Sequence, residues 1–280
     1  MAEPLLLCCD LDRTLIPNGA QSVSDGAMEA LARLAARPEV TLAFVTGRSR
    51  ILVERAILKW RLPVPDIVAG DVGTSIYDVG PEHLWREWQA WAERIAPDWN
   101  GHRHEALAAA LADIDLMTPQ SDEGQARFKL SYSAPADIDA PALIAAVEAR
   151  LAPLGVRAEV TWSIDETVPI GLVDILPKSA SKQGAVECIR QEKGFPPERT
   201  VFAGDSGNDL PVLAGPLRAI LVANATEAVR GEAQRLAALN GKTGDLYLAK
   251  GGFRGMNGCY AAGVLEGLAH FYPEVGEWLD

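Results

Sequence analysis

Short apolar strands alternate with amphipathic helices at both ends of this 280-residue chain, and this alternation limits the fold more than any other feature. The N-terminal part indicates strands over 5–9 and 40–45, a helix over 22–38 with Ser24 as its N-cap, and a helix ending near Trp60. The C-terminal part repeats the pattern, with strands over 171–176, 200–205 and 218–224 and helices over 181–193 and 258–271. Strands that alternate with helices predict an α/β fold with a doubly wound parallel sheet.

The middle of the chain follows a different pattern, from which we predict an inserted domain over 81–169 and a core made of 1–80 and 170–280. We expect two helices, a strand, a helix and a strand, in that order: 81–96, 102–114, 126–134, 139–151 and 156–163. Helices packed on a small antiparallel sheet form an α+β cap domain. Three tryptophans fall near one stripe of the first helix, which favours packing inside the cap over stacking on a sugar ring; they are Trp85, Trp88 and Trp91.

The chain carries a formal net charge of −12. A charge of this sign repels nucleic acid and anionic membranes at long range, so we expect neither as a partner. The first residues lack the basic flank of a signal peptide, and no apolar run is long enough to span a bilayer, which predicts a cytoplasmic protein. Four cysteines fit a reducing compartment, and Cys8 and Cys9 are expected to point to opposite faces of the sheet.

Polar side chains gather where the expected core strands end. Six residues do so, from four separate stretches of the chain: Asp10, Asp12, Thr46, Lys182, Asp205 and Asp209. Because open parallel sheets form their ligand crevice at the carboxyl ends of the strands, we expect these groups to meet at one edge. Taken alone, each has a plainer interpretation, such as a solvated turn, a helix cap or a surface lysine. Their shared position favours a joint site.

This set of side chains suits phosphoryl transfer assisted by Mg²⁺, a hard ion that prefers oxygen ligands. A carboxylate can attack phosphorus when a metal offsets the repulsion between two anions, and an aspartyl phosphate results. A second carboxylate, one residue along, can protonate the leaving group and later activate water. A threonine hydroxyl and a lysine ammonium can hold the other phosphoryl oxygens. The sequence therefore predicts a Mg²⁺-dependent phosphoryl-transfer enzyme.

The stretches DLDRT, TGR, SASKQG and GDSGND resemble the four motifs of the haloacid dehalogenase superfamily, in order and on both sides of the insert. The resemblance implies a Rossmann-like core and a cap similar to the type II cap of the subclass that includes sugar phosphatases. It implies Asp10 as nucleophile, Asp12 as acid and base, and Thr46 with Lys182 as phosphoryl binders. The predicted Mg²⁺ ligands are Asp10, Asp12, Asp205 and Asp209. Substrate contacts within the same motifs are predicted at Gly47, Arg48, Ser206 and Asn208.

Further stretches, including FKLSY and AAGVLEGLAHF, are similar to sucrose-phosphate phosphatases and to relatives that act on other glycosyl phosphates. This similarity implies a small phosphorylated sugar as the substrate. Many superfamily members carry glycine after the second aspartate, where this chain has Arg13. That arginine either adds positive charge near the phosphate or points to solvent.

Lys129 is the substrate-binding candidate within the insert. On an alternating strand it would share a face with Arg127 and Ser131 and could donate hydrogen bonds to sugar hydroxyls. A solvent-facing lysine is the plain alternative. Two other functions stay open: a phosphomutase, which would return the phosphoryl group to its substrate, and a catalytically idle domain that partners a glycosyltransferase. An active phosphatase could also pair functionally with a glycosyltransferase.

Overall fold

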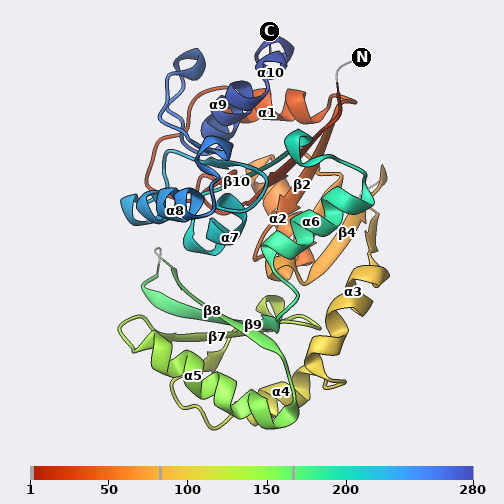
Figure 1. Cartoon of the computed structure of the whole chain (residues 1–280), viewed down its shortest axis with the longest axis vertical. Coiled ribbons are helices and arrows are strands. Elements are labelled where there is room, and N and C mark those ends of the chain that lie inside the picture. Colours follow the sequence, from red (N-terminus) through yellow and green to blue (C-terminus); the bar gives the residue numbers. More distant parts are fainter. Residues whose placement is uncertain (1–2, 82–83, 166–167, 280) are drawn as a thin grey trace.

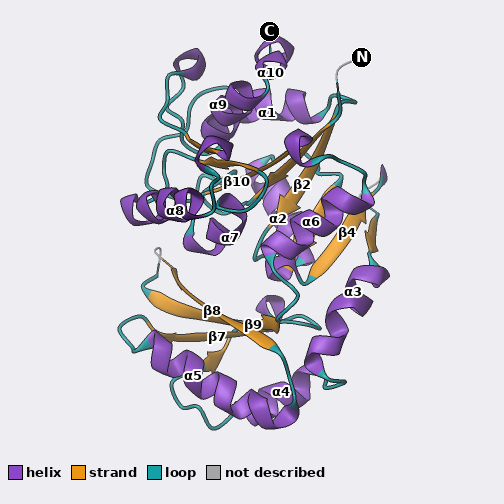
Figure 2. Ribbon diagram, in the orientation of Figure 1, coloured by secondary structure: helices purple, strands orange, loops and turns teal. Residues whose placement is uncertain are grey.

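The computed structural model describes residues 3–81, 84–165 and 168–279 and contains two β-sheets (Figures 1 and 2). The larger sheet has the strand order β12-β11-β10-β1-β2-β3-β4-β5, and the smaller has the order β6-β7-β9-β8. The strands are β1 (Leu5–Cys9), β2 (Val40–Val45), β3 (Ile67–Gly70), β4 (Ser75–Val79), β5 (Trp85–Glu87), β6 (Thr118–Pro119), β7 (Leu130–Pro135), β8 (Ala158–Asp165), β9 (Ile170–Pro177), β10 (Thr200–Gly204), β11 (Arg218–Leu221) and β12 (Leu246–Leu248).

Helices cover both faces of the larger sheet, as a doubly wound fold requires. The α-helices are α1 (Ala27–Ala35), α2 (Arg50–Trp60), α3 (Gln89–Ile95), α4 (His104–Ala110), α5 (Ala140–Leu151), α6 (Lys182–Glu192), α7 (Leu210–Leu213), α8 (Glu227–Leu239), α9 (Ala261–Phe271) and α10 (Pro273–Trp278). Residues of α6, α7 and α8 pack on one face, and residues of α1, α2, α9 and α10 pack on the other. None of the helices in the described part of the chain combines the length and apolar character needed to cross a membrane.

Strand β1 lies in the middle of the larger sheet and is fully buried. It pairs in parallel with β2 on one side and with β10 on the other, and these three strands end at the same edge. Cys8 belongs to one apolar cluster and Cys9 to the other, which confirms that they point to opposite faces. The predicted α/β fold with a parallel core is confirmed, while β4 and β5 add an antiparallel border to the sheet.

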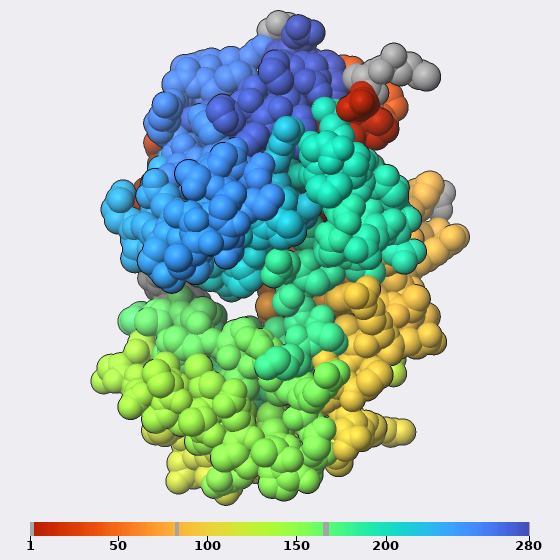
Figure 3. Space-filling view, in the orientation of Figure 1, coloured from red at the N-terminus to blue at the C-terminus, as the bar shows by residue number. Residues whose placement is uncertain are grey.

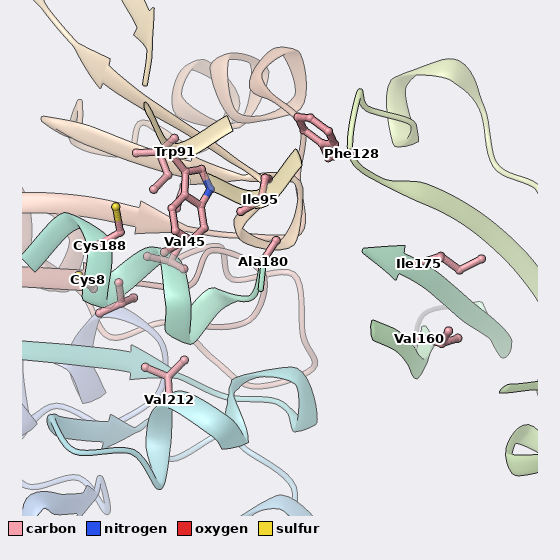
Figure 4. Close-up of a cluster of buried hydrophobic side chains, with 14 of the residues drawn as sticks. Cys8, Val45, Trp91, Ile95, Phe128, Val160, Ile175, Ala180, Cys188 and Val212 are labelled. Atoms are coloured by element: carbon pink, nitrogen blue, oxygen red, sulfur yellow. The ribbon is translucent and has the colours of Figure 1, made fainter. Parts of the chain in front are cut away.

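The smaller sheet is antiparallel throughout, and α5 packs against its strand β8. One buried cluster runs from Cys8 and Val45 in the larger sheet through Trp91 to Val160 and Ile175 in the smaller one (Figure 4). The space-filling view shows the surface hollowed between the two units (Figure 3). Buried apolar packing therefore continues from the core into the smaller unit.

The strand expected over 171–176 is present, but its expected place in the core is wrong. This segment is part of β9, which pairs antiparallel with both β7 and β8 along its length. An apolar run indicates a buried strand without indicating its sheet. A domain boundary at 169/170 would divide the smaller sheet, so we propose that the cap extends to Pro177, just before α6 begins at Lys182.

The helix expected over 81–96 is shorter than predicted. Residues 82 and 83 lie outside the described part, Trp85–Glu87 form β5 in the larger sheet, and α3 begins only at Gln89. The three tryptophans therefore do not share a helical stripe. Trp85 packs edge-on against Tyr77 at 5.5 Å between ring centroids, while Trp91 is buried and its Nε1 donates to the Gly73 carbonyl at 3.0 Å.

Two local expectations also differ. Ser24 is not the N-cap of α1. Gly26 holds that position with φ of 73°, a left-handed conformation that glycine adopts at little cost. The Ser24 hydroxyl instead donates to Asn257.

The strand expected over 126–134 begins only at Leu130, because Ala126 and Lys129 close a tight turn through two backbone hydrogen bonds of 3.1 Å. The turn shifts the alternation of side chains in this segment.

Candidate active site

The predicted polar residues meet at the carboxyl edge of the larger sheet. Asp10 follows β1, and its N–H donates to the Ala203 carbonyl of β10 at 2.9 Å. Thr46 follows β2, and its N–H donates to the Ala69 carbonyl of β3 at 2.9 Å. The acids of the loop after β10 lie beside Asp10. Parallel pairing of β2, β1 and β10 is what places these loops next to one another.

Lys182 connects the acids at the centre of the site. Its Nζ donates to Asp10 Oδ1 and to Asp209 Oδ1, both at 2.7 Å, and to Asn208 Oδ1 at 3.1 Å. Burial alone lowers the pKa of Lys182, but the adjacent Asp10 and Asp209 together raise it by more, so the net pKa is above the usual value. Lys182 is therefore a fixed ammonium cation, 3% exposed, between two carboxylates.

Three buried acids can share one ion. Asp10, Asp205 and Asp209 each offer a carboxylate oxygen, and these oxygens lie within 4.8 Å of one another. Burial raises the pKa of Asp10, and burial followed by the neighbouring Asp209 charge raises the pKa of Asp205 to about 7. Because all three donors are hard carboxylate oxygens close enough to share one ion, this group fits Mg²⁺.

The loop after β10 holds Asp209 in place through its backbone. Asp209 Oδ2 accepts hydrogen bonds from the N–H groups of Asp205 and Ser206 and from the Ser206 hydroxyl, each at 3.1 Å. A Cβ atom at residue 204 would lie 2.6 Å from the same oxygen, so this close approach requires Gly204. The Ser206 hydroxyl also lies 2.9 Å from Asn208 Oδ1, which accepts from it.

Asp12 does not join the group of three acids, although we predicted it as a Mg²⁺ ligand. Its carboxylate accepts hydrogen bonds from Arg48 Nε and Nη2 at 2.7 Å and from Asn18 Nδ2 at 2.8 Å. A tight turn after β1, in which Leu15 and Ile16 donate to the Leu11 carbonyl, directs the chain away from the strand. The hydrogen bonds that Arg48 donates to Asp12 are the leading cause that raises the pKa of Arg48.

The loop after β2 supplies the other predicted core contacts. The Thr46 side chain is buried, and its Oγ1 accepts a hydrogen bond from the Arg48 N–H at 3.3 Å. The Gly47 carbonyl accepts a hydrogen bond from Lys129 Nζ at 3.1 Å. The predicted residues of the core therefore lie beside the acids or the Arg48–Asp12 pair, in loops or, for Lys182, at the start of α6.

Lys129 reaches this loop from the smaller unit. Its side chain is 6% exposed, and its Nζ lies 3.7 Å from Asp174 Oδ1 in addition to its bond with Gly47. The plain alternative of a solvent-facing lysine is wrong. Arg127 does not share its face: it is exposed, and its guanidinium lies 4.8 Å from the centroid of the Phe128 ring. Ser131 is buried and donates to Asp174.

Three residues at the site were not predicted. The Thr14 hydroxyl donates to Asp205 Oδ1 at 3.2 Å, Asn18 binds Asp12, and Asp174 lies between Lys129 and Ser131. Thr14 lies inside the stretch DLDRT, and a hydroxyl so close to two predicted catalytic aspartates could have been predicted as a site residue. A lone acid within the apolar run GLVDIL was a similar signal for Asp174.

Comparisons with known proteins agree with this geometry. The family model described as sucrose-6F-phosphate phosphohydrolase matches residues 3–272. A HAD-like hydrolase of Nitrosococcus oceani is 50% identical over 281 residues, which cover 100% of this chain and 75% of that protein. Sucrose-phosphatase 1 of Nicotiana tabacum is 26% identical over 275 residues, which cover 96% of this chain and 60% of that enzyme. The chain thus spans less than two thirds of the tobacco enzyme.

A solved structure gives the same result for the fold. The sucrose-phosphatase of Synechocystis, in complex with sucrose and phosphate, superimposes with a TM-score of 0.75 at 26% sequence identity. The match covers 96% of this chain and 98% of that one, so it includes both the core and the smaller unit. The chain therefore belongs to the sucrose-6F-phosphate phosphohydrolase family, and it is a phosphatase of the haloacid dehalogenase superfamily.

Proposed function

We propose that this protein is a Mg²⁺-dependent phosphatase that hydrolyses a sugar or glycosyl phosphate resembling sucrose 6-phosphate. The observation that carries the proposal is the buried contact of Lys182 with Asp10 and Asp209, beside Asp205, at the carboxyl edge of a parallel sheet. The family and the sucrose-phosphatase structure support a sugar phosphate as substrate.

Asp10 is the proposed nucleophile. Lys182 holds Asp10 Oδ1, which leaves Oδ2 as the atom that attacks phosphorus, and the lysine charge balances part of the carboxylate charge. Mg²⁺, held by Asp10, Asp205 and Asp209, would offset the repulsion between the carboxylate and the phosphate. The product of the first step is an aspartyl phosphate on Asp10, with the sugar as leaving group.

Asp12 is the proposed acid and base. Arg48 and Asn18 fix the orientation of its carboxylate, which is 42% exposed and so can reach a substrate oxygen. A group that protonates the departing sugar oxygen is, by the same position, able to accept a proton from the incoming water. We assign phosphoryl binding to Thr46 and Lys182. We assign substrate contacts in the core to Gly47, Arg48, Ser206 and Asn208.

The smaller unit is proposed to act as a cap that selects the sugar. Lys129 lies at the interface with the core, in contact with the loop that follows β2, so a sugar attached to the phosphate would extend toward it. A lid over the site also excludes water, which protects the phosphoenzyme and strengthens electrostatic interactions. Functional pairing with a glycosyltransferase that supplies the sugar phosphate is part of the same proposal, and a coupled assay with the two enzymes tests it.

A phosphate-release screen tests the proposed function. Sucrose 6-phosphate, several hexose phosphates, other glycosyl phosphates and p-nitrophenyl phosphate would be compared in Mg²⁺, with Asp10→Asn as the inactive control. We expect free phosphate to accumulate fastest with a glycosyl or sugar phosphate. Conversion of the substrate into an isomeric sugar phosphate without phosphate release would instead establish a phosphomutase. Turnover by Asp10→Asn equal to that of the wild type would contradict the assigned nucleophile.

A further inference from the structure

Arg13 lies directly against the acids that would hold the metal. Its Nε is 3.4 Å from Asp205 Oδ2, and its side chain is only 19% exposed. It therefore does not point to solvent, which was one of the two expectations from the sequence. Arg13 and Thr14 contact different oxygens of the Asp205 carboxylate: Arg13 lies beside Oδ2, and the Thr14 hydroxyl donates to Oδ1.

The position of Arg13 is fixed from several directions. Asn224 Nδ2 donates to the Arg13 carbonyl at 2.6 Å, and Arg13 Nη2 donates to the Asn224 carbonyl at 3.2 Å. The Arg13 N–H donates to Asn18 Oδ1 at 2.9 Å. Its backbone has φ of 58°, the left-handed region that residues other than glycine seldom adopt. An arginine held in this way keeps its guanidinium beside Asp205.

We infer that Arg13 is a positioning residue that weakens the binding of Mg²⁺ by the three acids, and this inference rests on the proposed function. Lys182 pairs with Asp10 and Asp209, while Arg13 pairs with Asp205, so every acid of the group already has a fixed cation beside it. A divalent ion bound to Asp205 is therefore repelled by the guanidinium charge a few ångströms away. The site binds the metal less tightly than three bare carboxylates would.

This arrangement has a consequence for the phosphoryl group. A phosphate brings further negative charge to the site, which offsets the charges of Arg13 and Lys182. Metal binding and phosphate binding therefore favour each other, since each ligand supplies the charge that balances the other. Removing the charge of Arg13 therefore tightens Mg²⁺ binding in the absence of phosphate. It also reduces the increase in Mg²⁺ affinity that phosphate causes.

Isothermal titration with Mg²⁺ alone, and again with inorganic phosphate present, tests the inference without any turnover. The variants are Arg13→Gln, which removes the charge, Arg13→Lys, which keeps it, and Asp205→Asn, which removes a ligand. We expect Arg13→Gln to bind Mg²⁺ about tenfold more tightly than the wild type, Arg13→Lys to bind close to the wild-type affinity, and Asp205→Asn to bind more weakly. Thermal unfolding without metal checks that each variant is folded.

The outcomes separate this inference from the proposed function. If the wild type binds Mg²⁺ and Asp205→Asn binds it poorly, but Arg13→Gln binds it no more tightly than the wild type, then the role of Arg13 is wrong and the metal site stands. Equal tightening by Arg13→Lys and Arg13→Gln would also overturn the inference, because the effect would not follow the charge. If the wild type binds no Mg²⁺ with or without phosphate, both the metal role and the inference fail.

Discussion

Arg48 forms a bidentate pair with the Asp12 carboxylate, with Nε donating to Oδ2 and Nη2 donating to Oδ1, each at 2.7 Å. Arg48 lies two residues after Thr46, and Asp12 lies two residues after Asp10, so the pair joins the loop after β2 to the loop after β1. Two parallel hydrogen bonds fix the plane of a carboxylate as well as its distance. Proton transfer to a leaving group depends on that orientation.

Arg48→Ala is therefore expected to lower kcat/KM by about 10- to 100-fold, because Asp12 loses its orientation while the nucleophile is untouched. Arg48→Lys should recover only part of the loss, since an ammonium cannot form the two-pronged contact. Steady-state kinetics on the best substrate, with circular dichroism as the check on folding, measure the effect. An alanine variant with wild-type kcat/KM would show that Asp12 is oriented by other groups.

Asp10→Asn is expected to lower kcat by at least about 1,000-fold, because an amide is a poor nucleophile although it has almost the same shape as a carboxylate. The fold should persist, since Lys182 keeps its contact with Asp209 at 2.7 Å. Phosphate release and circular dichroism together check both statements. Substantial residual turnover in a folded variant would move the nucleophile to another residue.

Asp12→Ala is expected to slow both halves of the reaction. Formation of the phosphoenzyme loses its general acid, and hydrolysis of the phosphoenzyme loses its general base, each by about 100-fold or more. Rapid-quench measurement with a radiolabelled substrate follows the two steps separately. An unchanged rate for either half would assign that proton transfer to a different group.

The centre of the site was predictable because local features and sheet geometry agree there. The apolar runs that precede Asp10, Thr46 and Asp205 end abruptly at polar residues, and parallel strands must bring their carboxyl ends to one edge. The helix that carries Lys182 begins one residue after the predicted start, because Ser181 caps it: the Ser181 hydroxyl accepts from the Gly184 N–H at 3.0 Å. Local sequence and topology therefore gave the same answer.

The remaining features depend on contacts between distant segments. Strand β9 reads as a buried strand, but only its pairing with β7 and β8 decides that it lies in the smaller sheet. Lys129 is buried because the turn at Ala126 changes the alternation and because the Gly47 carbonyl, 82 residues away, accepts its hydrogen bond. The direction of the Asp12 side chain follows from Arg48 in the same way. Periodicity carries no information about such partners.

Lys129→Ala is expected to lower kcat/KM for the preferred sugar phosphate at least about tenfold more than for p-nitrophenyl phosphate, because the small ester needs only the core. Steady-state kinetics with both substrates measure the ratio. Arg127→Ala is the matched control, because Arg127 is a neighbouring cation that is exposed, and its removal should leave the ratio unchanged.

Equal losses on both substrates would give Lys129 a different role. Its bond to the Gly47 carbonyl would then act by positioning the loop after β2, which serves every phosphate ester. No loss on either substrate would remove Lys129 from the site and leave selection of the sugar to other segments, such as the loop over 70–74.

Asp71, in the loop after β3, should make the stability of the protein depend on pH. Asp71 Oδ2 accepts a hydrogen bond from the Ser75 hydroxyl at 3.1 Å, but Oδ1 is buried and receives none from the described residues. Burial, the leading cause, raises the pKa of Asp71 to about 6, although the Lys129 charge opposes the rise. The folded state therefore holds the Asp71 proton more tightly than the unfolded state does.

A group whose pKa is raised on folding stabilises the protein fully below its unfolded pKa, and the stabilisation is lost as pH rises through the folded pKa. Between about pH 5 and pH 7.5, ionisation of Asp71 should lower the free energy of unfolding by about 1 kcal/mol. Asn does not titrate, so Asp71→Asn removes this pH dependence. The free energy of unfolding of the variant, relative to that of the wild type, should therefore rise by about 1 kcal/mol between pH 5 and pH 7.5. Urea unfolding at the two pH values measures the change, and Asp122→Asn, at an exposed position, shows how much of it comes from removing any negative charge. A stability difference between Asp71→Asn and the wild type that stays constant or shrinks as pH rises would contradict a raised pKa of Asp71 in the folded protein.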